Sequence, residues 1–185
     1  MKVAGKFMIY FTADTHFYHS NIINLNGRPF RDIDEMNSVL VRNWNAYVSD
    51  RDEIYILGDF IFKGSGEEAN RILKRLRGKK YLIRGNHDKF LNDPVFECNA
   101  FEWVKDYYVL DHDKKKFVLF HYPILEWQGF FGDAAHLYGH VHNCNKDINQ
   151  LERLSVLTDR AMNVGVDVND YFPVSIEKVI KKCCS

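Results

Sequence analysis

The sequence predicts an α/β (α+β) fold. Over residues 7–88, apolar runs typical of strands alternate with two amphipathic helical segments, in the order strand, helix, strand, helix, strand. This order favours parallel strands with helices against the sheet, because parallel neighbours need a crossover connection. After residue 88 short strands and turns dominate, so we expect a β-rich, mostly antiparallel second half. No linker, internal repeat or low-complexity segment divides the 185 residues, which predicts a single domain over residues 1–185.

The first half contains three expected strands and two expected helices. The strands cover residues 6–12, 53–57 and 81–83. One helix should begin near Asp32 or Asp34, either of which can cap it, and continue to about Val48. The second should cover residues 67–77 and stop at Gly78. The long stretch 18–31 is expected to be a polar connection.

The second half is expected to begin with a hairpin. Residues 101–110 and 116–120 look like strands, and Asp111–Lys114 has the composition of a tight turn. Further strands are expected at 135–138 and 162–168, with a polar loop over 143–149. A final helix is expected within residues 173–181, capped by Ser175.

Composition excludes several classes of protein. The 25 basic and 25 acidic residues balance, so no global field favours nucleic acid or membrane. No apolar run approaches the roughly 18 residues that span a bilayer. The N-terminus lacks the apolar core of a signal peptide, and the four cysteines have no spacing typical of a disulfide framework or a zinc knuckle. We therefore expect a soluble, cytoplasmic protein without a membrane partner.

Polar side chains gather where the apolar runs end. Six of the eight histidines lie there, together with carboxylate and amide residues: Asp14, His16, His19, Asp59, Asn86, His87, His121, His140 and His142. On extended backbone, Asp-x-His and His-x-His would direct both side chains to one face. Mixed nitrogen and oxygen ligands without thiolate suit Mn, Fe, Zn, Ni or Co. Each fragment alone is weak evidence, but five in one chain predict a metal site.

These blocks, in their order and spacing, resemble the calcineurin-like metallophosphoesterase superfamily. They are Asp14-x-His16, Gly58-Asp59, Gly85-Asn86-His87-Asp88, His121 and Gly139-His140-x-His142. The resemblance implies a four-layer β-sandwich of two mixed sheets flanked by helices, with two divalent metal ions above the strand ends and Mn as our first guess. It further implies a hydrolase for phosphodiester or phosphomonoester bonds, in which a hydroxide held by both metals attacks phosphorus.

The resemblance also implies a role for each residue. Asp14, His16 and His142 would bind one metal, whereas Asn86, His121 and His140 would bind the other, with Asp59 bridging the two. His87 would face the substrate as an acid or a transition-state stabiliser. Asp88 would orient a site histidine or cap the following turn, and Gly85 would permit a sharp turn.

Two further residues are interpreted as substrate contacts. His19 lies three positions after His16, within reach of the phosphate or leaving group, and Arg28 could pair bidentately with a phosphate oxygen. Their alternatives are a loop histidine bonded to backbone and a surface arginine. Gly58-Asp59 lacks the Asp and Arg that follow it in protein Ser/Thr phosphatases, which favours the small bacterial or phage-type branch.

The substrate class stays open. A small phosphate ester is expected, with a linear or cyclic nucleotide as first choice, because aromatic residues near the motifs could stack a base. A nuclease is the alternative, provided that the basic residues between Lys74 and Arg84 lie beside the site. A non-catalytic binding module is less favoured, since all seven ligands are retained. The sequence does not indicate the oligomeric state.

Overall fold

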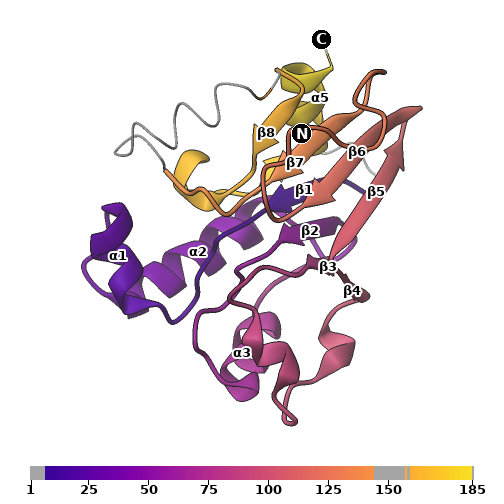
Figure 1. Cartoon of the computed structure of the whole chain (residues 1–185). Coiled ribbons are helices and arrows are strands. Elements are labelled where there is room, and N and C mark those ends of the chain that lie inside the picture. The colour runs from indigo at the N-terminus through magenta and orange to yellow at the C-terminus, as the bar shows by residue number, and fades with distance from the viewer. Residues whose placement is uncertain (1–6, 144–156, 158, 185) are drawn as a thin grey trace.

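A computed structural model describes residues 7–143, 157 and 159–184, which form two sheets packed face to face (Figure 1). The first sheet has the order β4 (Trp103–Lys105), β3 (Lys79–Ile83), β2 (Glu53–Leu57), β1 (Ile9–Thr12) and β9 (Val174–Ser175). The second has the order β5 (Tyr107–His112), β6 (Lys115–Phe120), β7 (Ala135–Tyr138) and β8 (Ala161–Asn163). Both sheets combine parallel and antiparallel pairs, as the resemblance implies.

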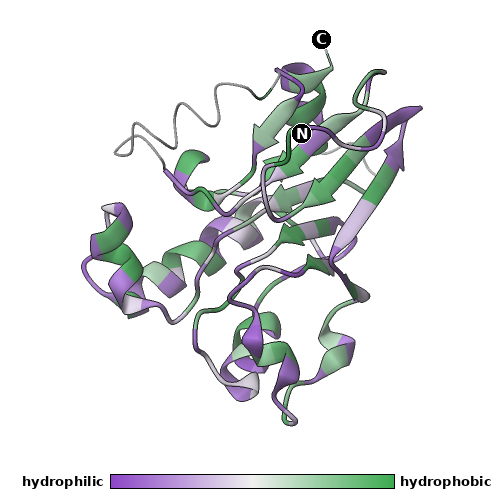
Figure 2. Ribbon diagram, in the orientation of Figure 1, coloured by the Kyte–Doolittle hydropathy of each residue, from purple (hydrophilic) through white to green (hydrophobic). Residues whose placement is uncertain are grey.

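Strands β1 and β2 of the first sheet are buried on both faces. Ile54 and Ile56 of β2 belong to the core beneath the helices, whereas Tyr55 and Leu57 belong to the core between the sheets. This division follows from the two-residue period of a strand, and it explains why these segments read as continuous apolar runs. Figure 2 shows the hydrophobic residues concentrated along these strands.

Helices cover the outer face of the first sheet. α2 (Ile33–Tyr47) places Met36, Leu40 and Trp44 in the core beneath that face, and α3 (Gly66–Leu73) adds Ile72. α1 (Ser20–Asn26) contributes Ile22 at the margin. α5 (Ile176–Cys183) contacts β1, β8 and β9, and its apolar residues join the core between the sheets. The connection 121–134 packs Trp127 on the outer face of the second sheet.

Most expected elements are confirmed. The strands at 53–57 and 135–138 have the expected bounds. Asp32 caps α2 by accepting the Glu35 N–H, and Ser175 caps α5. Ser65 and Glu68 form a capping box at the start of α3, just before the expected start of this helix at residue 67, and α3 ends at Leu73, four residues before the expected end. The turn between β5 and β6 holds Asp113 and Lys114 at positive φ, as a two-residue hairpin requires. Residues 144–149 of the expected polar loop lie outside the described residues.

Four expectations about the fold are wrong. The connection 18–31 contains α1, which ends at a left-handed Gly27. The stretch 101–110 is two strands, because the chain leaves the first sheet after β4 and enters the second at β5. The expected strand 162–168 ends at residue 163, and a 3-10 turn (Val166–Val168, η4) follows. The second half is not mostly antiparallel: β7 runs parallel to both β6 and β8, since the connections between them are long enough to cross over.

Two further 3-10 turns, η1 (Lys89–Asn92) and η2 (Cys98–Ala100), lie between β3 and β4. Among the described residues, no helix has the length and apolar character needed to cross a bilayer.

Candidate metal centre

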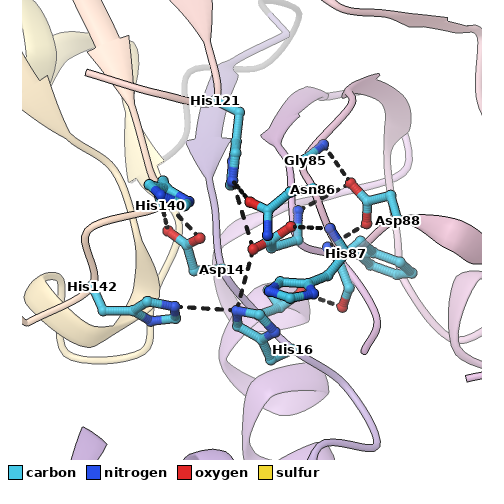
Figure 3. A network of polar contacts seen from close by, with 12 residues as sticks. Asp14, His16, Gly85, Asn86, His87, Asp88, His121, His140 and His142 are labelled. Carbon is cyan, nitrogen blue, oxygen red and sulfur yellow. Dashed lines mark hydrogen bonds and ion pairs between the residues drawn. The ribbon is translucent and has the colours of Figure 1, made fainter. Parts of the chain in front are cut away.

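Five strand ends converge at one end of the sandwich. β1, β2 and β3 of the first sheet deliver Asp14, Asp59 and Asn86, while β6 and β7 of the second sheet deliver His121 and His140. These strands all run in the same direction within their sheets, so their carboxyl ends share one edge. Hydrogen bonds then join the two sheets, because the His140 N–H donates to both carboxylate oxygens of Asp14 at 3.0 and 2.9 Å (Figure 3).

The converging side chains form two groups with the spacing of metal ligands. In the first group, Asp14, His16 and His142 each offer an atom within 4.8 Å of the others. Asp59, His121 and His140 do the same in the second group. Asp59 lies between the groups: its Oδ2 is 3.6 Å from His16 Nε2 and 3.6 Å from His121 Nε2. The structure thus brings together the residues that the sequence predicts as ligands.

The second group fits a cation on hydrogen-bonding grounds. His121 Nδ1 lies 2.8 Å from the Leu57 carbonyl, which only accepts, so Nδ1 carries the proton and Nε2 is a bare lone pair. That lone pair faces Asn86 Oδ1 at 3.1 Å and Asp59 Oδ2 at 3.6 Å. Tyr122 Oη donates to the same Asn86 oxygen at 3.4 Å, which supports this orientation of the amide. Three acceptors that face one another require a positive charge between them.

The first group fits a cation in the same way. His142 Nδ1 donates to Asp167 Oδ2 at 2.8 Å, so His142 Nε2 is free to act as a ligand. It lies 3.2 Å from His16 Nε2, and Figure 3 shows the two rings pointing toward one another. His16 is buried, and its Nδ1 has no hydrogen-bond partner among the described residues.

Burial sets the charges in this cluster. It lowers the pKa of His16, His121 and His140, which keeps these imidazoles neutral and able to bind metal. Burial also raises the pKa of Asp14 to about 7 in the metal-free protein. His142 differs, because its hydrogen bond to Asp167 and the charge of Asp14 outweigh burial and raise its pKa.

The backbone at the ligands is left-handed, not extended as the sequence suggested. Asp14, His16, Asp59, His140 and His142 have φ values of 55°, 47°, 53°, 69° and 45°. Non-glycine residues occupy this region at roughly 1–2 kcal/mol each, which is typical of functional sites. The two side chains of Asp14-x-His16 therefore converge through two left-handed residues, and not through strand alternation.

Gly85 is required for space, which corrects the sharp turn that we expected. Its φ is not positive, but a Cβ there would lie 2.3 Å from Asp59 Oδ1 and 2.4 Å from Asp59 N. Gly58, at φ 87°, would place a Cβ 2.4 Å from His121 Nδ1. These two glycines let the loops after β2 and β3 approach each other closely.

Asp88 holds the same two loops together. Its carboxylate accepts the N–H groups of Asp59 at 3.0 Å, Phe60 at 2.8 Å and Gly85 at 2.8 Å. It makes no side-chain cap to the turn that follows. Both sequence interpretations of Asp88 are therefore wrong, because its partners are backbone groups and not a histidine ring or a helix end.

His87 and His19 lie beside the first group, against Phe62. The backbone N–H of His87 donates to Asp59 Oδ1 at 2.9 Å, and the centroid of the His87 ring is 5.6 Å from the centroid of the His16 ring. Phe62 contacts the His87 ring edge-on and stacks on His19 with a centroid distance of 3.7 Å. Burial and the nearby Arg28 lower the pKa of His19 to about 4, so His19 is neutral near pH 7. Both rings are partly exposed at the rim.

Arg28 does not bind phosphate, contrary to the sequence interpretation. Its side chain is fully buried, and all five donors are used. Two pair with Asp167, two reach the carbonyls of Asp14 and Thr15, and one contacts Met36 Sδ. Asp167 is the residue that sequence reasoning missed, since 162–168 was read as a strand. Its signal was an aspartate two residues after a glycine, in Gly165-Val166-Asp167, whereas in Gly58-Asp59 the two residues are adjacent.

The basic residues between Lys74 and Lys80 lie at the opposite end of the first sheet. Lys79 and Lys80 begin β3, whereas the candidate site follows its last residue. Lys74 pairs with Glu97, and Arg84, which does follow β3, pairs with Asp106 on the surface. A nuclease would need these basic residues beside the candidate site, and they do not lie there.

Comparison with known proteins agrees with this geometry. A model of the calcineurin-like phosphoesterase family matches residues 7–144. An uncharacterized protein of Methanocaldococcus jannaschii is 36% identical over 176 residues, which cover 94% of this chain and 89% of that protein. The gene 66 protein of Mycobacterium phage L5 is 31% identical over 43% of this chain and 39% of its own.

Among solved structures, a protein of unknown function from Aquifex aeolicus superposes with a TM-score of 0.74 and 31% identity. The match covers 95% of this chain and 99% of that one. The family match, the two sheets and the two ligand groups agree with one another, and the chain belongs to the calcineurin-like phosphoesterase family.

Proposed function

We propose that this protein is a metal-dependent hydrolase of phosphate esters, with small phosphodiesters as first substrates and phosphomonoesters as second. The observation that carries the proposal is the position of Asp59 Oδ2, which lies 3.6 Å from a ligand nitrogen of each group. One carboxylate oxygen shared by two ligand groups is what a pair of divalent ions requires. Asp14, His16 and His142 would hold one ion, and Asn86, His121 and His140 the other.

The chemistry needs both ions at once. When bound, a metal pair lowers the pKa of a water molecule and neutralises the non-bridging phosphate oxygens during in-line attack. We assign the protein residues the tasks of holding that geometry and handling the leaving group. Neutral imidazoles and a nitrogen-rich ligand set support Mn, Fe, Zn, Ni or Co over Mg, which prefers oxygen.

His87 is assigned to the leaving group. Its backbone N–H donates to the carboxylate of Asp59, which would hold both ions, and the residue is partly exposed beside the first group. It is thus close to the site without joining either ligand group. We propose that it donates a proton or a hydrogen bond to the departing oxygen, and that His19, stacked on Phe62 next to it, contacts the substrate.

Tyr122 is the aromatic side chain best placed for a substrate ring. It is 36% exposed, and its ring lies 4.6 Å from that of His140. Phe17, Phe60 and Trp127 are buried and cannot stack a base. These facts support a diester with an aromatic or nucleoside substituent, linear or cyclic. The distance of the Lys74–Lys80 residues from the site supports a small substrate over nucleic acid.

The test is a hydrolysis panel with matched variants. Metal-free protein is loaded with Mn, Ni, Zn, Co or Mg and assayed on an aryl phosphodiester, an aryl phosphomonoester and cyclic nucleotides. Asp59→Asn and His87→Ala should each lower turnover at least about 100-fold, with metal retained in His87→Ala. His112→Ala is the control and should be fully active, because His112 is at the end of β5 that lies away from the candidate site. Absence of hydrolysis with every metal would overturn the proposal.

A further inference from the structure

A buried ion pair lies behind the first ligand group and belongs to neither group. Arg28 and Asp167 are separated by 139 residues, and their side chains are 0% and 2% exposed. Nε of Arg28 donates to Oδ1 of Asp167 at 2.8 Å, and an NH2 hydrogen donates to Oδ2 at 2.9 Å. This is the bidentate geometry in which arginine and carboxylate bind most strongly.

Asp167 extends this pair to a ligand. The same Oδ2 accepts the Nδ1 proton of His142 at 2.8 Å. That bond fixes the tautomer, so the lone pair of His142 is on Nε2, which faces His16 Nε2 at 3.2 Å.

Arg28 extends the pair to the other two ligands of the group. Two of its three remaining terminal hydrogens donate to the carbonyls of Asp14 at 2.8 Å and Thr15 at 3.0 Å. These carbonyls lie in the loop that carries Asp14 and His16 at left-handed φ. One guanidinium thus restrains the backbone of two ligands and, through Asp167, the side chain of the third.

We propose that Arg28 and Asp167 are positioning residues that set the affinity of the first metal position, the one formed by Asp14, His16 and His142. The inference rests on the proposed function, because it assumes a metal at that position. No comparable pair of buried charges supports the second group among the described residues, where the Leu57 carbonyl orients His121 instead. The two positions should therefore respond differently when the pair is changed.

Asp167→Asn is the direct variant. In the wild-type protein both carboxylate oxygens of Asp167 face hydrogen-bond donors. Asparagine replaces one of these oxygens by an NH2 group, which is itself a donor. Either orientation of the amide points hydrogens at the Arg28 fork or at His142 Nδ1. In the second case His142 would move its proton to Nε2 and lose its ligand lone pair. Outer partners of this kind typically change metal affinity by about 10–100-fold.

Arg28→Lys tests the fork itself. Lysine keeps the charge but cannot reach two carbonyls and two carboxylate oxygens at once. The control matched to Asp167→Asn is Asp106→Asn, which makes the same Asp-to-Asn change in the exposed Arg84–Asp106 pair at 2.9 Å. That pair follows β3 but touches no ligand, so its loss should leave both metal affinities unchanged.

The measurement is a metal titration of the metal-free protein. Calorimetry with Mn²⁺ gives the two affinities. The histidine ¹⁵N shifts during a titration with diamagnetic Zn²⁺ identify which position fills, because each shift changes when its nitrogen binds the ion. In Asp167→Asn and Arg28→Lys, one equivalent of Zn²⁺ should shift His121 Nε2 and leave His142 Nε2 unchanged, and the affinity of the first position should be lowered about 10–100-fold. Two wild-type affinities in Asp167→Asn, or equal weakening at both positions together with a lower melting temperature, would overturn the proposal.

A measurement on the wild-type protein does not depend on the folding of any variant. At alkaline pH without metal, the His142 ¹⁵N shifts should show a protonated Nδ1 and a bare Nε2. The opposite tautomer would overturn the inference. Wild-type protein that binds two Mn²⁺ ions but hydrolyses no ester would defeat the proposed function alone, whereas failure to bind any ion would defeat both.

Discussion

Gly85→Ala should disable the site through one added methyl group. Gly85 lies between β3 and Asn86, and its φ is not positive, so alanine adds no backbone strain of the left-handed kind. The new Cβ would lie 2.3 Å from Asp59 Oδ1 and 2.4 Å from Asp59 N. The second contact is backbone, which cannot rotate away.

The size of the effect follows from these distances. Ordinary contact begins at 3.4 Å, so the loops carrying Gly85 and Asp59 must separate by about 1 Å. Asp88 bonds the N–H groups of both residues and resists that separation. Overpacking of this kind lowers the free energy of unfolding by about 1–3 kcal/mol. A displacement of about 1 Å at a reacting centre lowers turnover about 100-fold.

The assay compares Gly85→Ala with Gly132→Ala. A Cβ at Gly132 would meet only the Gly129 carbonyl, at 3.4 Å, so this control should fold and react as wild type does. Urea unfolding of the metal-free proteins gives stability, and hydrolysis of an aryl phosphodiester at saturating metal gives turnover. If Gly85→Ala matches Gly132→Ala in both measurements, the close approach of the two loops is not what positions Asp59.

Three other predictions concern buried groups. Asp88→Asn leaves one oxygen for three N–H donors and should lower the free energy of unfolding by about 2–4 kcal/mol in urea, whereas Asp93→Asn, at a partly exposed residue, should have a smaller effect; equal losses would contradict this. Burial lowers the pKa of His136 below 6.5, so this residue binds fewer protons in the folded protein than in the unfolded chain as the pH falls through 6.5, and its contribution to stability should fall by up to about 1.4 kcal/mol per pH unit. His136→Gln should reduce that slope in unfolding measured against pH, and an unchanged slope would exclude His136 as its source. Burial raises the pKa of Cys183 to about 11, so in a Cys144→Ser background a thiol reagent near pH 8 should label exposed Cys98 in the native protein and Cys183 only after unfolding; native labelling of Cys183 at the rate of Cys98 would refute its burial.

The sequence predicted the parts of the fold that depend on local signals. Strand β2 is a run of apolar residues that ends in Gly58-Asp59, and α2 has both a capping aspartate and helical spacing. These features act within a few residues, so a pattern detects them. The break between β4 and β5 was missed, because the choice of sheet depends on partners far along the chain, such as Tyr81 for Trp103 and Phe120 for Tyr107.

The same distinction holds within the candidate site. The predicted ligands are polar residues directly after apolar strands, so their positions were readable, although their roles as ligands stay predictions. The contacts that hold them were not readable, because they join distant segments through groups that carry no sequence signature. Asp88 meets three backbone N–H groups, and Arg28 meets two backbone carbonyls. For this reason Arg28 was interpreted as a contact to the substrate phosphate, although its partners lie within the protein.

Arg28 and Asp88 are the residues whose contacts hold the left-handed backbone of the predicted ligands. Each predicted ligand with a left-handed φ has an unfavourable backbone conformation. Without opposing contacts, the loops after β1 and β2 would relax to a more favourable conformation. Arg28 fixes the carbonyls of the first loop, and Asp88 fixes the N–H groups of the second. The loops also bond to each other, since Asp14 N donates to the Gly58 carbonyl and His16 N to the Asp59 carbonyl, both at 3.0 Å. The backbone of the site is therefore restrained by contacts within the protein, and such restraint lowers the entropic cost of assembling a set of ligands.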